Sequence, residues 1–149
     1  MPIVAQTTPS EGNLVIHEEG KEVGFAREGI TVNETAATTY GAGFVVGKVT
    51  ATGKWKLCSP TASDGSQVAA GVIVQDNNGY ANEFTVPAVT DTKVVAIVRG
   101  DVLLSKGAIR FGAGFTTQVQ KDAALAQLEA LNIRNTVTVK LDNKYNKGE

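Results

Sequence analysis

The sequence predicts a mainly β protein: a small β-barrel or sandwich-like body with one late α-helix, preceded by an extended N-terminal arm. Its 149 residues include 16 glycines and many Thr, Ala and Val, a composition that favours strands and turns. Short apolar stretches of strand length alternate with turn-forming clusters along most of the chain, a spacing typical of small barrels and sandwiches. Only one segment, close to the C-terminus, has its apolar residues at helical spacing.

The N-terminal arm is predicted from the uneven distribution of charge. Residues 1–34 carry six acidic and two basic residues, whereas the remaining 115 residues carry nine acidic and twelve basic ones. We therefore expect an acidic arm at residues 1–28, a near-neutral β-rich body at residues 29–141 and a polar tail at residues 142–149. Two stretches of the arm can form strands, Leu14–Ile16 and the alternating Val23–Phe25.

The first half of the body contains an alternating strand and a hairpin. The alternation across Ile30–Asn33 predicts an edge strand. Phe44–Thr50 and Lys54–Cys58 are joined by Ala51, Thr52 and Gly53, and this short glycine-containing connection predicts an antiparallel hairpin.

The middle of the chain supplies the most apolar strands. Val68–Val74 is apolar on both faces, which predicts a strand that is covered on both sides. Pro87 confines Phe84–Val89 to a sheet edge or a bend. Val94–Arg99 reads as another buried strand, and a further strand is expected over Val102–Leu104.

A helix is predicted over Lys121–Leu131. Thr117 and Gln120 have the spacing of a capping box, and Asn132 can end the helix in the left-handed conformation. Alternation across residues 133–141 then predicts a half-buried closing strand. The apolar stripe of the helix consists of Ala124, Leu125, Leu128 and Leu131.

Composition argues against most forms of chemistry. The formal net charge of −1 argues against a general nucleic-acid binder. One cysteine, Cys58, and one histidine, His17, exclude an internal disulfide, a Cys-based zinc site and a two-histidine metal site. The longest nearly apolar run, Val68–Val74, is far shorter than a membrane span, and the first dozen residues lack the basic and apolar regions of a secretory signal.

The glycine-rich stretch from Gly41 to Lys48 does not form a nucleotide-binding motif. Gly43 and Gly47 are separated by three residues, whereas a P-loop needs four, and Val49 stands where a Ser or Thr would meet magnesium. We interpret the stretch as the glycine-rich start of a strand. The sequence therefore predicts no catalytic residue, no cofactor site and no metal site.

Several segments follow one another in a recognisable order: Ala26–Glu28 followed by Ile30–Val32, Gly43–Thr50, Thr52–Trp55, Asp64–Ile73, Val98–Gly100 and the Ala-Leu helix that ends at Asn132 and Ile133. In their order and spacing these segments resemble the head decoration proteins of lambda-like tailed bacteriophages. The resemblance extends from about residue 12 to about residue 139, and one departure from it is Asn132, where relatives often have Gly.

This resemblance implies a non-enzymatic capsid decoration (cement) protein. Such a protein binds the expanded phage head as homotrimers at three-fold sites and stabilises it against internal DNA pressure. Its partner is the major capsid protein, with no direct contact to nucleic acid or membrane. Its expected location is the outer surface of the virion capsid, after synthesis in the host cytoplasm.

The resemblance also assigns a role to the arm, which in this family adds a strand to the shell protein. Main-chain hydrogen bonds to an open sheet edge suit a short strand-capable segment. The residues expected to bind the capsid are Leu14, Val15, Ile16, Val23, Phe25 and Arg27.

Two other functions remain open from the residues alone. A virion or surface β-rich module that binds carbohydrate or another ligand needs an exposed aromatic platform, for which Trp55, Tyr40 and Tyr80 are candidates. Nothing in their spacing brings these residues together. A small trimeric nucleotide hydrolase needs an Asp with a partnered Tyr in a glycine-flanked motif, and the sequence shows no such motif.

Overall fold

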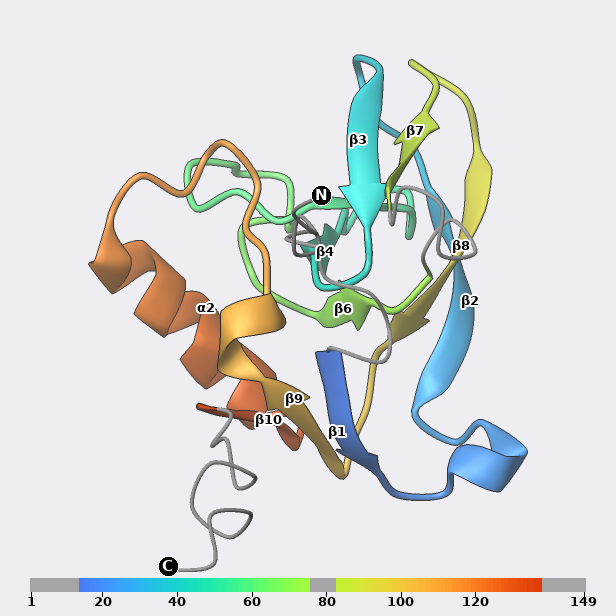
Figure 1. Cartoon of the computed structure of the whole chain (residues 1–149). Helices are drawn as coiled ribbons and strands as arrows, with labels where there is room; N and C mark the ends of the chain where they lie inside the picture. The colour runs from blue at the N-terminus through green and yellow to red at the C-terminus, as the bar shows by residue number, and fades with distance from the viewer. Residues whose placement is uncertain (1–13, 76–82, 138–149) are drawn as a thin grey trace, which may run out of the picture.

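A computed structural model of the chain describes residues 14–75 and 83–137 (Figure 1). Within these ranges it contains short strands arranged in a barrel, a three-stranded sheet and a two-stranded ribbon, with a single α-helix near the end. The predicted class, mainly β with one late helix, is confirmed. The polar tail predicted at residues 142–149 and the last residues of the predicted closing strand lie outside the described ranges.

Five strands close into a barrel with the neighbour order β2-β5-β4-β6-β8. Strand β2 pairs with β8 along its whole length and in parallel with β5 at a single pair, Val32 with Trp55. The edge strand predicted over Ile30–Asn33 is therefore wrong, because β2 has a neighbour on each side. The bounds are β2 (Arg27–Val32), β4 (Val45–Lys48), β5 (Trp55–Leu57), β6 (Gly71–Ile73) and β8 (Thr92–Ile97).

The predicted hairpin is present as β4 and β5. The two strands pair antiparallel from Val46 opposite Leu57 to Lys48 opposite Trp55. Gly53 in their connection has a φ of 71°, a left-handed conformation that glycine adopts without a steric penalty.

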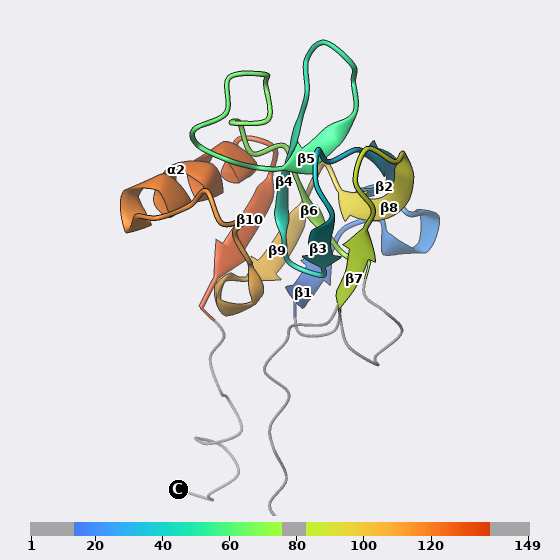
Figure 2. The same ribbon diagram turned by 90° about the horizontal axis from the view of Figure 1, so that it is seen from above.

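The three-stranded sheet has β9 in its centre, with β1 antiparallel on one side and β10 parallel on the other. Val15 lies opposite Leu104 and Thr136 lies opposite Ser105. The chain therefore enters β1 and leaves β10 at the same end of this sheet (Figure 2). The bounds are β1 (Val15–Glu18), β9 (Val102–Ser105) and β10 (Ile133–Thr136).

The two-stranded ribbon consists of β3 (Thr38–Gly41) and β7 (Glu83–Val86), which pair antiparallel. Pro87 follows β7 directly, as predicted for a proline that cannot continue a paired strand.

Helix α2 (Gln118–Glu129) lies beside the three-stranded sheet (Figures 1 and 2). Its predicted capping box is complete, because the Thr117 hydroxyl accepts from the Gln120 amide and the Gln120 side chain accepts from the Thr117 amide. The helix ends before Asn132, which has the predicted left-handed φ of 63°.

Two apolar clusters form the core. One joins α2, the three-stranded sheet and one side of the barrel, and includes Leu14, Leu104 and Leu128. The other fills the barrel and the space beneath the ribbon, and includes Ile73 and Tyr40. Burial of this aliphatic surface is the main source of stability for a domain that has no disulfide in its described part.

Two predicted extended stretches differ from the structure. Around Val23 the chain forms a 3₁₀ turn, η1 (Lys21–Val23), because Gly20 and Gly24 on either side are left-handed, with φ of 69° and 66°. Of the predicted strand Val68–Val74, only Gly71–Ile73 is a strand.

The boundary predicted between arm and body at residue 28 also differs from the structure. Leu14 is fully buried in the core and β1 is hydrogen-bonded to β9. Residues 14–28 therefore belong to the packed body. The main chain of β1 pairs with an edge of β9 that would otherwise be unpaired, and the Leu14 side chain is buried in the core. Residues 1–13 lie outside the described ranges.

Candidate functional site

Five of the six residues predicted to bind a capsid fall into two groups. Leu14 is buried, and Val15 packs partly buried against the core. Ile16, Val23 and Phe25 are exposed, by 47%, 84% and 52% respectively. Only the exposed group is available to a partner in this conformation.

Arg27, the sixth predicted residue, is bound to a buried carboxylate. The Glu18 side chain is fully buried, and Arg27 donates to it from Nε at 3.0 Å and from Nη2 at 2.8 Å. A guanidinium that meets a carboxylate through two nitrogens forms one of the stronger polar pairs in proteins. Arg27 therefore fastens β1 to the start of β2, and its expected role as a capsid contact does not fit this geometry.

The connection between β1 and β2 presents two apolar side chains to solvent. The Gly20 carbonyl accepts hydrogen bonds from the amides of Val23 and Phe25, at 3.2 and 3.3 Å. This closes the chain into a compact turn whose outer surface carries Val23 and Phe25, which we call the apolar turn. Pairs of left-handed glycines make so tight a turn possible.

Arg99 holds the apolar turn from the side of the barrel. Its Nη1 donates to the Phe25 carbonyl at 2.7 Å and its Nη2 to the Glu28 carboxylate at 2.6 Å. The guanidinium also lies 5.9 Å from the centre of the Phe25 ring, within cation–π range. The half-exposed ring is thus fixed before any partner arrives, which lowers the entropic cost of binding through it.

Strand β1 continues this exposed region as a sheet edge. Among the described strands it pairs only with β9, and both Ile16 and His17 in its middle are exposed. An exposed strand edge offers unpaired main-chain groups to an added strand.

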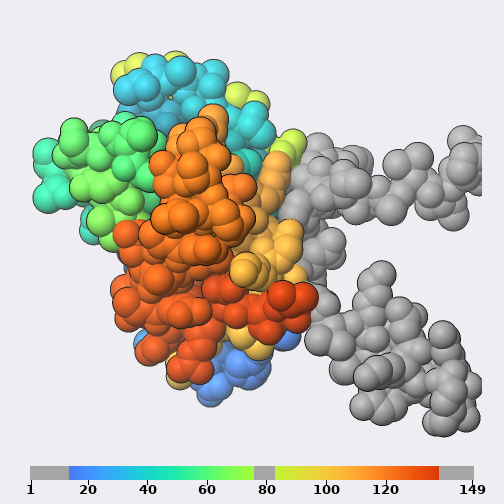
Figure 3. All heavy atoms as spheres, turned by 90° about the vertical axis from the view of Figure 1, so that its left-hand side faces the viewer, coloured from blue at the N-terminus to red at the C-terminus, as the bar shows by residue number. Residues whose placement is uncertain are grey.

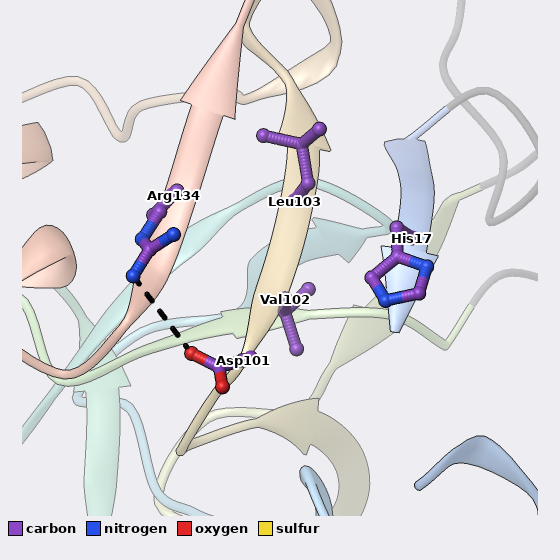
Figure 4. A pocket seen from close by; sticks show the side chains of 5 residues that line it. All are labelled: His17, Asp101, Val102, Leu103 and Arg134. Carbon is purple, nitrogen blue, oxygen red and sulfur yellow. Dashed lines mark ion pairs between the residues drawn. The ribbon is translucent and has the colours of Figure 1, made fainter. Parts of the chain in front are cut away.

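A shallow hollow of about 220 Å³ lies across the outer face of the same sheet (Figure 4). His17, Leu103 and Arg134 occupy one row in register on β1, β9 and β10. Arg134 lies 3.9 Å from Asp101, and both side chains are more than 60% exposed. Alternation along β10 puts Arg134 on the face opposite the buried Ile133. That Arg134 shares a face with His17 depends on long-range pairing with β9, which no local pattern in the sequence indicates.

The described residues offer little for catalysis. They contain no group of three or more His, Cys, Asp or Glu side chains arranged to hold a metal ion. Burial raises the pKa of the Cys58 thiol to about 11, so that the nucleophilic thiolate is scarce at neutral pH. No helix in the described ranges is long and apolar enough to cross a membrane.

Tyr40, a candidate for an aromatic ligand platform, has a structural role instead. Its ring is fully buried and its hydroxyl donates to the buried Glu34 carboxylate at 2.5 Å. The Leu57 amide donates to the same carboxylate at 2.8 Å. Burial, together with the Glu34 carboxylate, raises the pKa of Tyr40. Trp55 is half-buried on the barrel, and Tyr80 lies outside the described ranges.

Comparison with known proteins identifies the family. No curated protein matches the chain. The family model of the bacteriophage lambda head decoration protein D matches residues 4–133, which is most of the chain. That family is structural, and its members bind the capsid of the phage head. An exposed strand edge and an apolar turn suit such a role, and the chain belongs to the bacteriophage lambda head decoration protein D family.

Proposed function

We propose that this protein is a cement protein, which binds the expanded phage head as homotrimers at three-fold sites and stabilises the head against internal DNA pressure. The observation that carries the proposal is the family match over residues 4–133. The exposed edge of β1 and the apolar turn support it, because they give the body a partner-binding region that the fold itself does not use.

In this proposal the contact to the major capsid protein combines the chain before β1 with the surface beside it. Residues 1–13 act as the arm and add a strand to the shell protein, while Ile16, Val23 and Phe25 pack against it. Leu14, Val15 and Arg27 fix the direction in which the arm leaves the body. The register of the sheet supports this assignment, since the chain enters β1 and leaves β10 on one side of the molecule.

Stabilisation would follow from differential affinity. A ligand that binds only the expanded lattice lowers the free energy of that state and leaves the unexpanded state unchanged. No chemical step is needed, which agrees with the structural character of the family.

The alternative of a carbohydrate- or ligand-binding module has no observation in its favour. It needs stacked exposed aromatic rings, and one of its three candidate residues, Tyr40, is fully buried.

The test uses DNA-filled, expanded heads that lack decoration. Adding the protein should raise the temperature at which the heads release DNA, with saturation at three copies per three-fold site. A variant with both Val23→Asp and Phe25→Asp should need at least roughly tenfold more protein for the same protection, because charges replace apolar contacts.

Ala51→Asp serves as the matched control, because Ala51 is exposed in the β4–β5 connection, at the far end of the molecule from the start of β1 (Figure 2). It should protect heads like the unmodified chain. Unchanged DNA release at saturating protein would contradict the cement function, and equal weakening by both variants would contradict the assigned contact surface.

A further inference from the structure

A groove of about 330 Å³ lies between the β5–β6 connection and the first turns of α2. In Figure 3 it lies where the green surface of that connection meets the orange surface of α2, on a different side of the body from the apolar turn. None of the described residues that line the groove is charged. Three of the six glutamines of the chain are among them, Gln67, Gln120 and Gln127.

The floor of the groove is apolar. Phe115 and Ala124 line it from below, and both belong to the core. Pro60, Val119 and Ala123 present apolar side chains at its rim, and Val119 is 78% exposed. A partner that covers these side chains gains free energy from the burial of apolar surface.

The three glutamine side chains are held by the main chain. A side-chain amide accepts hydrogen bonds through Oε1 and donates them through Nε2, so a contact from a main-chain N–H fixes which end of the amide is the oxygen. Each Oε1 accepts at 2.7 to 3.2 Å, in Gln67 from the amide of Gly65, in Gln127 from that of Ala69, and in Gln120 from those of Thr116 and Thr117.

This arrangement leaves the three Nε2 groups as donors. Within the described ranges none of them donates a hydrogen bond. They are open to solvent, because Arg110 Nη1 is the one buried side-chain nitrogen or oxygen without a partner in the described part of the chain. A ligand in the groove therefore meets uncharged donors around an apolar floor, and the oxygens of the same amides are already engaged by the main chain.

The ligand that fits such a lining carries acceptors without neighbouring donors. Proline supplies this pattern, because its carbonyl accepts and it has no N–H. A run of prolines also adopts the polyproline II conformation before it binds, which lowers the entropic cost of docking into an apolar groove.

Two other classes of ligand match the groove less well. The hydroxyls of a sugar donate as well as accept, and the Phe115 ring, which is 9% exposed, is too buried for a sugar to stack on it. A carboxylate or phosphate would lie against the apolar floor without a countercharge, which is costly.

We infer that the groove on α2 binds a proline-rich segment of a partner protein in the polyproline II conformation. Main-chain carbonyls of the segment accept from Nε2 of the three glutamines, and its rings pack on Val119 and Ala123. The site is additional to the proposed contact with the shell, because it shares no residue with that contact.

The test uses the full-length ¹⁵N-labelled chain, with a capped decaproline peptide as the probe. The side-chain amide signals of Gln67, Gln120 and Gln127 should shift and saturate, because these groups gain acceptors. The signal of Gln75 should not move, since Gln75 lies outside the groove and its Oε1 accepts from the Val95 amide at 3.0 Å. A capped Gly-Ser peptide of equal length is flexible and keeps its N–H groups, so it should bind at least roughly tenfold more weakly.

Gln120→Glu combined with Gln127→Glu removes donors while it keeps the fold. Glu retains the oxygen that the main chain uses, and at position 120 it preserves the capping box. The melting temperature should therefore stay within about 3 °C, while the affinity for decaproline falls at least roughly tenfold. Gln75→Glu is the matched control, because it makes the same chemical change outside the groove and should bind decaproline like the unmodified chain.

Val119→Asp is a second variant, at a position whose exposure means that the fold does not depend on it. It should also weaken the binding of decaproline, because a charge replaces an apolar contact. The inference is overturned if decaproline leaves the three glutamine signals unmoved, or if the Gly-Ser peptide binds equally well. Unchanged affinity in the double Glu variant or in Val119→Asp would overturn it as well, and so would equal weakening by Gln75→Glu.

Discussion

Glu18 and Arg27 hold the first described strand of the chain against the barrel. The Glu18 carboxylate is fully buried, so that removing its partner leaves a charge without compensation. We expect Arg27→Ala to lower the free energy of unfolding by about 2 kcal/mol, below the range for fully buried pairs because the Arg27 side chain is 22% exposed. Urea unfolding measures the change.

Arg134→Ala is the control for that measurement, since its pair with Asp101 is long and exposed on both sides. Arg134→Ala should lower the free energy of unfolding by less than about 0.5 kcal/mol. Equal losses from the two substitutions would show that the Arg27 pair does not fasten β1 to β2.

Val89, which has a φ of 50°, provides a second test at the scale of single residues. Asn tolerates the left-handed conformation better than a β-branched side chain does, and little buried surface is lost because Val89 is 75% exposed. Val89→Asn should therefore raise the free energy of unfolding by roughly 1 kcal/mol and the melting temperature by about 3 °C. Val119→Asn is the control, because Val119 is equally exposed but has a helical backbone. It should change the free energy of unfolding and the melting temperature by no more than a few tenths of the changes expected for Val89→Asn. A loss of stability in Val89→Asn would argue against strain at Val89.

Asp64 makes the stability depend on pH in the acid range. Its carboxylate accepts from the Ser66 hydroxyl and amide at 2.6 and 3.0 Å and pairs with Lys56 at 3.2 Å. These contacts lower the pKa of Asp64 from 3.8 to about 2 in the folded protein. Between these values the unfolded chain binds more protons, so the stabilising contribution is present above about pH 4 and is lost as the pH falls towards 2.

Unfolding in urea at a series of pH values from 5 to 2 tests this behaviour. Asp64→Asn should show a shallower loss of stability between pH 4 and pH 2 than the unmodified chain. Parallel curves would mean that the contacts to Ser66 and Lys56 do not favour the charged form of Asp64.

At the scale of elements, β1 decides where the arm ends and the body begins. Deleting residues 1–13 removes nothing from the described fold, and we expect the melting temperature to stay within about 2 °C while binding to capsids weakens strongly. Deleting residues 1–18 also removes Leu14, strand β1 and Glu18, and truncating one buried Leu already costs about 2–5 kcal/mol. That shorter chain should melt far earlier.

Calorimetry and capsid binding of the two truncated chains distinguish the contributions. Full capsid affinity after loss of residues 1–13 would mean that the arm is not a binding element. An unchanged melting temperature after loss of residues 1–18 would mean that β1 is not part of the stable body.

Helices and hairpins that are determined by residues close together in the chain could be predicted from the sequence. The α2 helix followed from its apolar stripe, its capping box and Asn132, and the β4–β5 hairpin followed from Gly53. Each of these depends on residues within a few positions of one another.

Features that depend on distant partners could not be read in this way. The two neighbours of β2, the parallel pairing of β9 with β10 and the burial of Leu14 are set by segments far away in the chain. The candidate site shows the same division. Ile16, Val23 and Phe25 are exposed as a contact surface requires, whereas Arg27 is engaged by Glu18, a partner nine residues away that no local pattern indicated.

The whole molecule is expected to act on the phage head by binding alone, without a chemical step. The family is structural, and the proposed effect on the head is a matter of differential affinity. A protein that binds both forms of the shell equally could not favour one of them, however tightly it binds.

The most direct measurement is therefore the affinity of the full-length chain for expanded and unexpanded shells of the same phage, determined side by side at one salt concentration. We predict binding to expanded shells at least roughly 100-fold tighter, which corresponds to about 2.7 kcal/mol of stabilisation for each bound copy. Equal affinity for the two shells would contradict the central claim, since nothing would then remain to hold the head in its expanded state.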